Sequence, residues 1–235
     1  MFALANPARA TLMLEFRFDN PLPAGFPSSG PPQTQAGATW TRGDLSVTAT
    51  CAEQGNDGCS VTQNAEGLGV RDHFFDSSNI DGLGDNEQLI LTWSRPVKIL
   101  RIDFERVGRY DESALIIDGV LKAAGYIKQA LGIPSATATC AGVDDGLGGT
   151  ECEISLDLVA MNFVGTRIAF GDSLGLGFSL DPFDSFRVES IVAMQVPEPG
   201  SLALMAVGFS GLGVIFRHRR RRPAARRIRG RSPLR

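Results

Sequence analysis

The chain has 235 residues, of which 43% are hydrophobic and 21% charged, and its formal net charge is −3. This charge is unevenly distributed: residues 1–196 have 13 Lys and Arg against 25 Asp and Glu, a net charge of −12, whereas residues 197–235 hold ten Arg and one acid. An acidic globular domain has no electrostatic footprint for nucleic acid, so nucleic-acid binding is excluded for residues 11–196.

Residues 1–10 have the small residues of a signal-peptide cleavage region, with Ala3-Leu4-Ala5 and Ala8-Arg9-Ala10 as candidate sites. A secretory signal also needs a basic start and an apolar stretch of about 7–15 residues, and this segment has neither. We therefore expect residues 1–10 to be the remnant of a signal peptide whose start lies upstream. A disordered terminus is the alternative.

Residues 11–196 alternate apolar and polar side chains with the period of β-strands rather than that of helices. Strands are expected at residues 11–18, 45–50, 88–94, 97–104, 114–117, 120–122, 154–158, 167–170 and 186–194. Asp118-Gly119 predicts a tight hairpin turn, and only residues 126–131 predict a helical turn. Many short strands at this spacing predict an all-β domain, an antiparallel β-sandwich or jelly roll, over residues 11–196.

The four cysteines fall in two close pairs, Cys51 with Cys59 and Cys140 with Cys152. An even number of cysteines in an exported protein indicates disulfides, for which three connectivities exist. We favour bonds within each close pair, because each pair flanks a Gly/Asp-rich turn and follows a Thr-rich strand. Each bond is then expected to join the two strands of one hairpin. Neither pair has the Cys-x-x-Cys spacing of a zinc or redox site.

Acidic and amide side chains crowd into residues 76–87, where Gly82 and Gly84 also lie. The candidate ligands are Asp76, Asn79, Asp81, Asp85 and Glu87. Calcium takes six to eight oxygen ligands on flexible, Gly-containing loops, so a calcium site is one interpretation. An EF-hand does not fit, because Gln88 stands where the pattern needs a chelating carboxylate. The other interpretation is turn formation, for which Asp, Asn and Gly are common residues.

Catalytic patterns are scarce in residues 11–196. His73 is the single histidine of this part, and the Gly-x-Ser-x-Gly pattern of a nucleophile elbow does not occur. A two-histidine zinc site is therefore excluded here, and a hydrolase triad has only His73 to build on. We expect no enzyme and no certain cofactor, with calcium as the one candidate.

The C-terminal part of the chain, from Val196 onwards, consists of three consecutive segments. Val196-Pro197-Glu198-Pro199-Gly200 is followed by an uncharged apolar run at residues 201–216 and then by a basic cluster. The arginines of this cluster are Arg217, Arg219, Arg220, Arg221 and Arg222. A helix over residues 201–216 would be about 24 Å long, slightly short of a bilayer core. The absence of charge and the arginines after it favour a single transmembrane helix with its basic end, residues 217–235, in the cytoplasm.

This order of parts, with Val196-Pro197-Glu198-Pro199, resembles the PEP-CTERM sorting signal of Gram-negative bacteria. The resemblance implies an exosortase as partner, an inner-membrane-anchored precursor with its domain on the periplasmic side, and later transfer to the cell surface or extracellular matrix. Residues 67–70, 80–82, 87–97 and 184–188 are similar to segments of PEP-CTERM ectodomains. That second similarity implies a β-sandwich, and it does not supply an active site.

Two functions remain open. The first is an exported structural protein of the surface or extracellular matrix, processed through its tail by exosortase. The alternative is a β-sandwich module that binds exopolysaccharide, with calcium as a candidate ligand. Aromatic side chains lined up in a solvent-facing groove would favour carbohydrate binding, and the Trp and Tyr residues of the chain are Trp40, Trp93, Tyr110 and Tyr126.

Overall fold

The computed structural model describes residues 13–19, 33–35, 37–53, 58–71, 79–81, 87–144, 150–177, 180 and 184–196. The chain separates into two compact units, residues 1–196 and 197–235, and the fold below is that of the first. No helix among the described residues has the length and apolarity needed to cross a membrane. The transmembrane helix expected at residues 201–216 lies outside the described residues.

Fourteen antiparallel strands and a short 3-10 helix, η1 (Ile127–Gly132), make up the described domain. The strands are β1 (Met13–Arg17), β2 (Gln33–Gln35), β3 (Ala38–Arg42), β4 (Leu45–Glu53), β5 (Ser60–Asn64), β6 (Gly67–Arg71), β7 (Ile80–Asp81), β8 (Glu87–Val107), β9 (Glu112–Ile117), β10 (Val120–Tyr126), β11 (Thr137–Asp144), β12 (Thr150–Asp157), β13 (Val164–Gly171) and β14 (Ser185–Gln195). The expected all-β, antiparallel class is confirmed.

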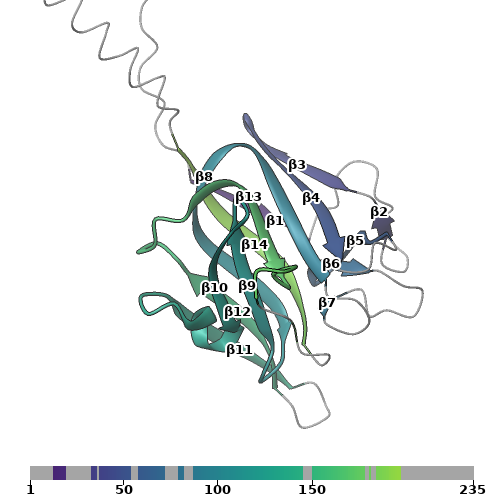
Figure 1. Ribbon diagram of the computed structural model, residues 1–235, viewed down its shortest axis with the longest axis vertical. Helices are drawn as coiled ribbons and strands as arrows, with labels where there is room; N and C mark the ends of the chain where they lie inside the picture. The colour runs from purple at the N-terminus through teal and green to yellow at the C-terminus, as the bar shows by residue number, and fades with distance from the viewer. Residues whose placement is uncertain are drawn as a thin grey trace, which may run out of the picture. The chain divides into compact units, whose positions relative to one another are not determined.

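Strand β8 is 21 residues long and changes partners halfway. In its first half, Thr92 is paired with Thr48 of β4 and with Arg167 of β13. In its second half, Ile102 is paired with Leu156 of β12 and with Ile191 of β14. The strand therefore arches from one group of neighbours to another around residues 94–96, as Figure 1 shows.

Two strand sets result. The first set runs β3, β4, first half of β8, β13, β9 and β10. The second set runs β11, β12, second half of β8 and β14, and β14 continues to β1 and to β6, β5 and β2. The sequence predicts two separate strands at residues 88–94 and 97–104, and two sheets. The structure instead has one sheet that folds over on itself, because the β8 backbone stays extended through Arg95-Pro96.

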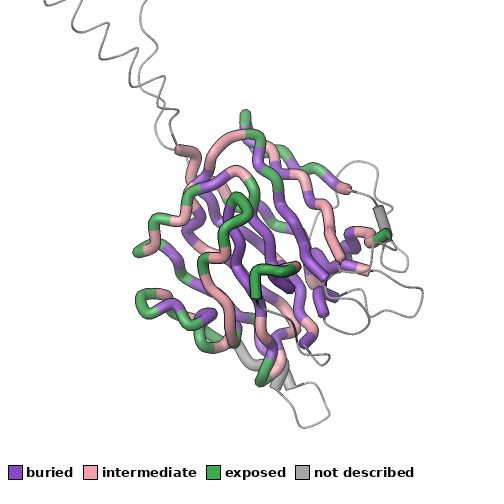
Figure 2. The backbone as a smooth tube through the Cα atoms, in the orientation of Figure 1, coloured by how far each residue is buried: buried purple, intermediate pink, exposed green. Residues whose placement is uncertain are grey.

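The core lies between the two strand sets, where three edge-to-face aromatic pairs connect one set to the other. The ring centroids are 4.9 Å apart for Phe16 and Trp93, 5.0 Å for Phe18 and Trp40, and 5.8 Å for Phe104 and Phe170. Such pairs add to the stability gained by burying the rings themselves. Figure 2 shows the buried residues concentrated along the strands and the exposed ones at turns and outer strands.

The hairpin expected at Asp118-Gly119 is confirmed. Ile117 of β9 is paired with Val120 of β10, which leaves a two-residue turn between them. Asp118 and Gly119 have φ values of 48° and 78°, the left-handed values that such a turn requires of both central residues. The Asp118 carboxylate also accepts a hydrogen bond of 2.8 Å from the Arg167 amide, which attaches the turn to β13.

Both disulfides join the expected cysteines, with Cα atoms 6.1 Å apart for Cys51–Cys59 and 5.4 Å for Cys140–Cys152. The second bond lies within a hairpin, since β11 and β12 are paired along their whole length. For the first bond the expected hairpin is wrong. Cys51 is on β4, whose partners are β3 and β8, whereas Cys59 precedes β5, whose partners are β6 and β2. This disulfide therefore links the first strand set to the second.

Candidate functional site

Strand β14 leads directly into the sorting motif predicted from the sequence. Val196 is the one member of Val196-Pro197-Glu198-Pro199 among the described residues, and its amide donates a hydrogen bond of 3.1 Å to the carbonyl of Pro96. The arginine cluster at residues 217–222 lies outside the described residues. Pro197 and Pro199 lack an amide hydrogen and have a fixed φ, which disfavours continuation of regular strand pairing beyond Val196.

The predicted calcium loop is described in part. His73, Asp76 and Asp85 lie outside the described residues, whereas Asn79, Asp81 and Glu87 are buried. The Glu87 carboxylate accepts a hydrogen bond of 3.2 Å from the Asp81 amide. The Asn79 carboxamide also forms hydrogen bonds with two side chains of β14. Calcium binding by this loop stays a prediction.

Arg187 of β14 is 1% exposed and forms the centre of a buried polar network. Its guanidinium donates to Asn79 Oδ1 and Asn64 Oδ1, both at 2.9 Å, to the Gly67 carbonyl at 2.7 Å and to Thr62 Oγ1 at 3.3 Å. Burial lowers the pKa of Arg187 to about 10, so the side chain stays charged at neutral pH. We call these five residues the Arg187 network.

Three of the segments that resemble PEP-CTERM ectodomains contribute to or adjoin this network: residues 67–70 form most of β6, residues 80–81 form β7, and residues 184–188 begin β14. The backbones approach closely here, because a Cβ added to Gly67 would lie 2.4 Å from the Val188 carbonyl oxygen. Asn79 also donates a hydrogen bond of 2.6 Å to Ser185 Oγ. The network holds β5, β6, β7 and β14 together, and its buried arginine is inaccessible to solvent.

A second polar site is one that sequence reasoning missed. Glu105 of β8, Glu153 of β12 and Glu189 of β14 each place a carboxylate oxygen within 4.8 Å of the others. We call these residues the acidic cluster. They come from three strands far apart in the sequence, and only the pairing of β12 and β14 on either side of β8 brings them together. The alternation within each strand carries no signal for this pairing.

Crowding of like charges perturbs the acidic cluster. Burial raises the pKa of Glu105 to about 7, and the carboxylates of Glu189 and Glu153 add to the rise. Burial and Glu153 also raise the pKa of Glu189, although Arg17 forms an ion pair of 2.9 Å with it. Three such carboxylates can share protons or contribute oxygens to a divalent cation.

Glu105→Gln is expected to stabilise the protein at pH 8 by about 1–2 kcal/mol, after allowance for solvent screening. The folded pKa of Glu105 lies above its unfolded value of about 4.5, so wild-type stability rises as the pH falls through 7 and is lost as the pH rises through it. The advantage of the variant should therefore vanish near pH 4.5. Melting temperatures of wild type and the Glu105→Gln variant between pH 4.5 and 8.5 measure this difference in stability.

Wild type and the Glu105→Gln variant should still share some pH dependence, because burial also raises the pKa of Asp111 to about 7. Asp111 accepts a hydrogen bond of 2.6 Å from the Gly108 amide and is left unchanged in this comparison. Parallel profiles for the two proteins would contradict the assignment of the pH dependence to Glu105.

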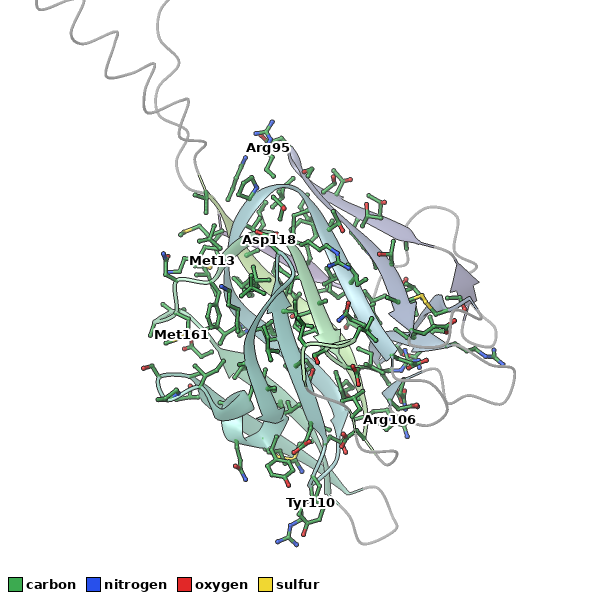
Figure 3. All side chains as sticks on the ribbon, viewed as in Figure 1. Met13, Arg95, Arg106, Tyr110, Asp118 and Met161 are labelled. Carbon is green, nitrogen blue, oxygen red and sulfur yellow. A yellow bond between two sulfur atoms is a disulfide. The ribbon has the colours of Figure 1, made fainter. Side chains whose placement is uncertain are left out.

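The four residues proposed for a carbohydrate groove do not line one surface. Trp40 and Trp93 are buried, with 8% and 3% exposure, and both belong to the core. Tyr110 and Tyr126 are exposed, and their ring centroids are 6.4 Å apart. The Arg109 guanidinium lies 5.2 Å from the centre of the Tyr110 ring. The aromatic surface is thus a tyrosine pair with an adjacent cation, and Figure 3 shows Tyr110 at one end of the domain.

Comparison with known proteins bears on the tail. No curated protein and no solved structure matches the chain. The family model of the PEP-CTERM protein-sorting motif matches residues 195–222, which begin at the last residue of β14 and extend through the basic cluster. The chain therefore carries a PEP-CTERM protein-sorting motif, the mark of an exported protein that exosortase processes.

Proposed function

We propose that this protein is a structural component of the cell surface or extracellular matrix, which exosortase releases from the inner membrane by cutting at or near Pro197-Glu198-Pro199. The observation that carries the proposal is the PEP-CTERM match at residues 195–222. The net charge of −12 on residues 1–196 suits a soluble, self-repelling exported domain. The two disulfides suit an oxidising compartment.

In the precursor, the apolar run at residues 201–216 occupies the bilayer and the arginines after it stay in the cytoplasm. Small residues in this run, such as Gly208, Gly211 and Gly213, allow close contact with the helices of a membrane-embedded enzyme. The folded domain, which ends at Val196, then lies on the periplasmic side. Cutting at the motif removes the anchor and frees the domain.

Intact-mass measurement of the protein released from the cell surface tests this function. Released wild-type molecules are expected to have lost the apolar run and residues 217–235. Finding the arginine-rich end on released molecules would contradict processing by exosortase.

The tyrosine pair favours a second function, the binding of exopolysaccharide. Exposed aromatic rings supply flat apolar surface against which sugar rings can pack, and Arg109 beside Tyr110 can pair with an acidic sugar. Val159, which is 57% exposed, offers a matched apolar control elsewhere on the surface.

Replacing Tyr110 and Tyr126 together with alanine is expected to weaken glycan binding by at least about tenfold, since two stacking rings each contribute about 1 kcal/mol. Val159→Ala should bind as wild type does. A glycan array with and without calcium identifies the ligand, and titration of the best glycan gives the dissociation constants. Equal binding by all three proteins would exclude the tyrosine pair as the binding surface.

A further inference from the structure

We propose that the precursor rests on the outer surface of the inner membrane through one row of side chains: Met13, Lys98, Val164 and Met194. We call these four residues the exit row. The inference rests on the proposed function, because it requires the tail to enter the bilayer. The inference specifies which part of the domain contacts lipid, and therefore how the domain is oriented when exosortase acts.

The strand registers define the exit row. Met13 of β1 is paired with Met194 of β14, Met194 with Lys98 of β8, and Lys98 with Val164 of β13. Residues paired in antiparallel strands point to the same face of the sheet, so the four side chains lie side by side. Met13 is 62% exposed and Val164 37%, and Lys98 and Met194 are partly exposed.

The exit row lies where the chain leaves the domain. Gln195 is paired with Val97, and the Val196 amide binds the Pro96 carbonyl. Residues 197–200 are therefore all that separate Val196 from the apolar run, and the five Cα–Cα steps from Val196 to Ser201 span at most about 18 Å. Once the run is in the bilayer, this end of the domain is held within that distance of the lipid.

Polarity along the same face changes with distance from the exit row. The next row contains Arg101, which pairs with Glu15 at 3.5 Å. The row after it contains Asp103, which accepts a hydrogen bond of 2.7 Å from Ser155. The acidic cluster around Glu105 follows, about 23 Å from Lys98 along β8.

The change from apolar side chains in the exit row to acidic ones farther along the face favours lipid as the surface that the exit row contacts. Two methionines and a valine suit the apolar side of a membrane interface, and Lys98 suits anionic headgroups. The acidic cluster, at the other end of the face, would be repelled by those headgroups. The apolar area is too small to hold a free domain on a membrane, so contact depends on the high local concentration that the tail supplies. Cleavage of the tail therefore also ends this contact.

Fluorescence quenching on the full-length chain tests the orientation. Met13→Cys and Tyr110→Cys variants are each labelled with bimane and reconstituted into phosphatidylethanolamine–phosphatidylglycerol vesicles with and without brominated lipid. The native cysteines are in disulfides and do not compete for the label. Tyr110 is the matched control, because Figure 3 places Tyr110 at one end of the domain, with Met13 on its side and nearer the opposite end, where Arg95 lies.

Brominated lipid is expected to quench the label at position 13 at least twofold and to leave the label at position 110 unchanged. Lys98→Glu should reduce the quenching at position 13, whereas Lys122→Glu on the exposed edge strand β10 should not. Equal quenching at both positions, in protein that still sediments with the vesicles, overturns the orientation and leaves the proposed function intact. Failure to sediment overturns both. If the fluorescence of the label at position 13 instead changes equally in vesicles with and without brominated lipid, the exit row would be assigned to self-association and the proposal overturned.

Discussion

Arg187→Met is expected to lower the free energy of unfolding by about 2–5 kcal/mol, because several buried polar groups lose a hydrogen-bond donor at about 1–3 kcal/mol each. The substitution leaves Asn64, Asn79, Thr62 and the Gly67 carbonyl without the donor that they share. Thr62 is fully buried and Asn79 is 5% exposed, so water replaces the guanidinium poorly at these positions. Arg187→Lys should also destabilise the protein, because an ammonium group lacks the fork that reaches four acceptors.

Arg101→Met is the matched control. Arg101 is also on a central strand of the second set, but its side chain is 42% exposed and its partners Glu15 and Asp103 lie at 3.5 and 3.1 Å. Exposed ion pairs contribute about 0–1 kcal/mol, so this variant should unfold close to the wild-type midpoint. Urea denaturation compares the three variants with wild type, and equal m-values are needed for the comparison. An Arg187→Met variant within 1 kcal/mol of wild type would show that the Arg187 network does not hold the strands together.

Features encoded within a few residues could be predicted from the sequence. The period of two predicted the longer strands but not β2, β3, β5, β6 or β7. Asp118-Gly119 predicted the hairpin turn because its two residues accept left-handed backbone angles. The cysteine pairing also followed from proximity, since eight and twelve residues separate the bonded cysteines. The sorting motif is linear, and no folded partner is needed to read it.

Features that depend on strand partners could not be predicted in the same way. Alternation in β14 would place Arg187 on the face opposite Phe186 and Val188, in solvent. The residue is buried because β6 and β7 also pair with this part of β14, at Val188 and at Ser185-Phe186. The acidic cluster and the link that Cys51–Cys59 makes between strand sets are likewise products of pairing between distant segments. Alternation assigns a residue to a strand face, but it does not say what covers that face.

The exit row and the acidic cluster lie at opposite ends of one sheet face. The first is largely apolar with one lysine, and the second is acidic. A domain of this net charge could carry its acids anywhere on its surface, yet the exit row contains no acid, and the nearby Asp44 is paired with Arg95 at 3.2 Å. In the anchored precursor that we propose, such a distribution would keep the acidic cluster away from the membrane.

Replacing Pro197, Glu198 and Pro199 together with alanine is expected to abolish release and leave a membrane-anchored precursor in a host that has exosortase. Val196 is still hydrogen-bonded to Pro96, and Pro197 and Pro199, which lack amide hydrogens and have a fixed φ, disfavour further strand pairing. Alanines would restore the amides, so β14 could extend along β8 toward Arg95 and withdraw the motif from the enzyme. Glu198 also keeps this stretch out of the hydrocarbon, and its loss lets the segment sink into the bilayer.

Gln195→Ala is the matched control for the motif variant, because Gln195, the last residue of β14 and the first of the family match, lies outside the substituted Pro197-Glu198-Pro199. This control should be cut and released as wild type is. Membrane fractionation followed by intact-mass measurement distinguishes the precursor from the processed form in all three proteins. Because the triple substitution leaves the Arg187 network and both disulfides untouched, a folded but uncleaved precursor assigns the defect to recognition of the motif. Normal release of the triple variant would mean that exosortase selects this chain by its apolar run and arginines alone.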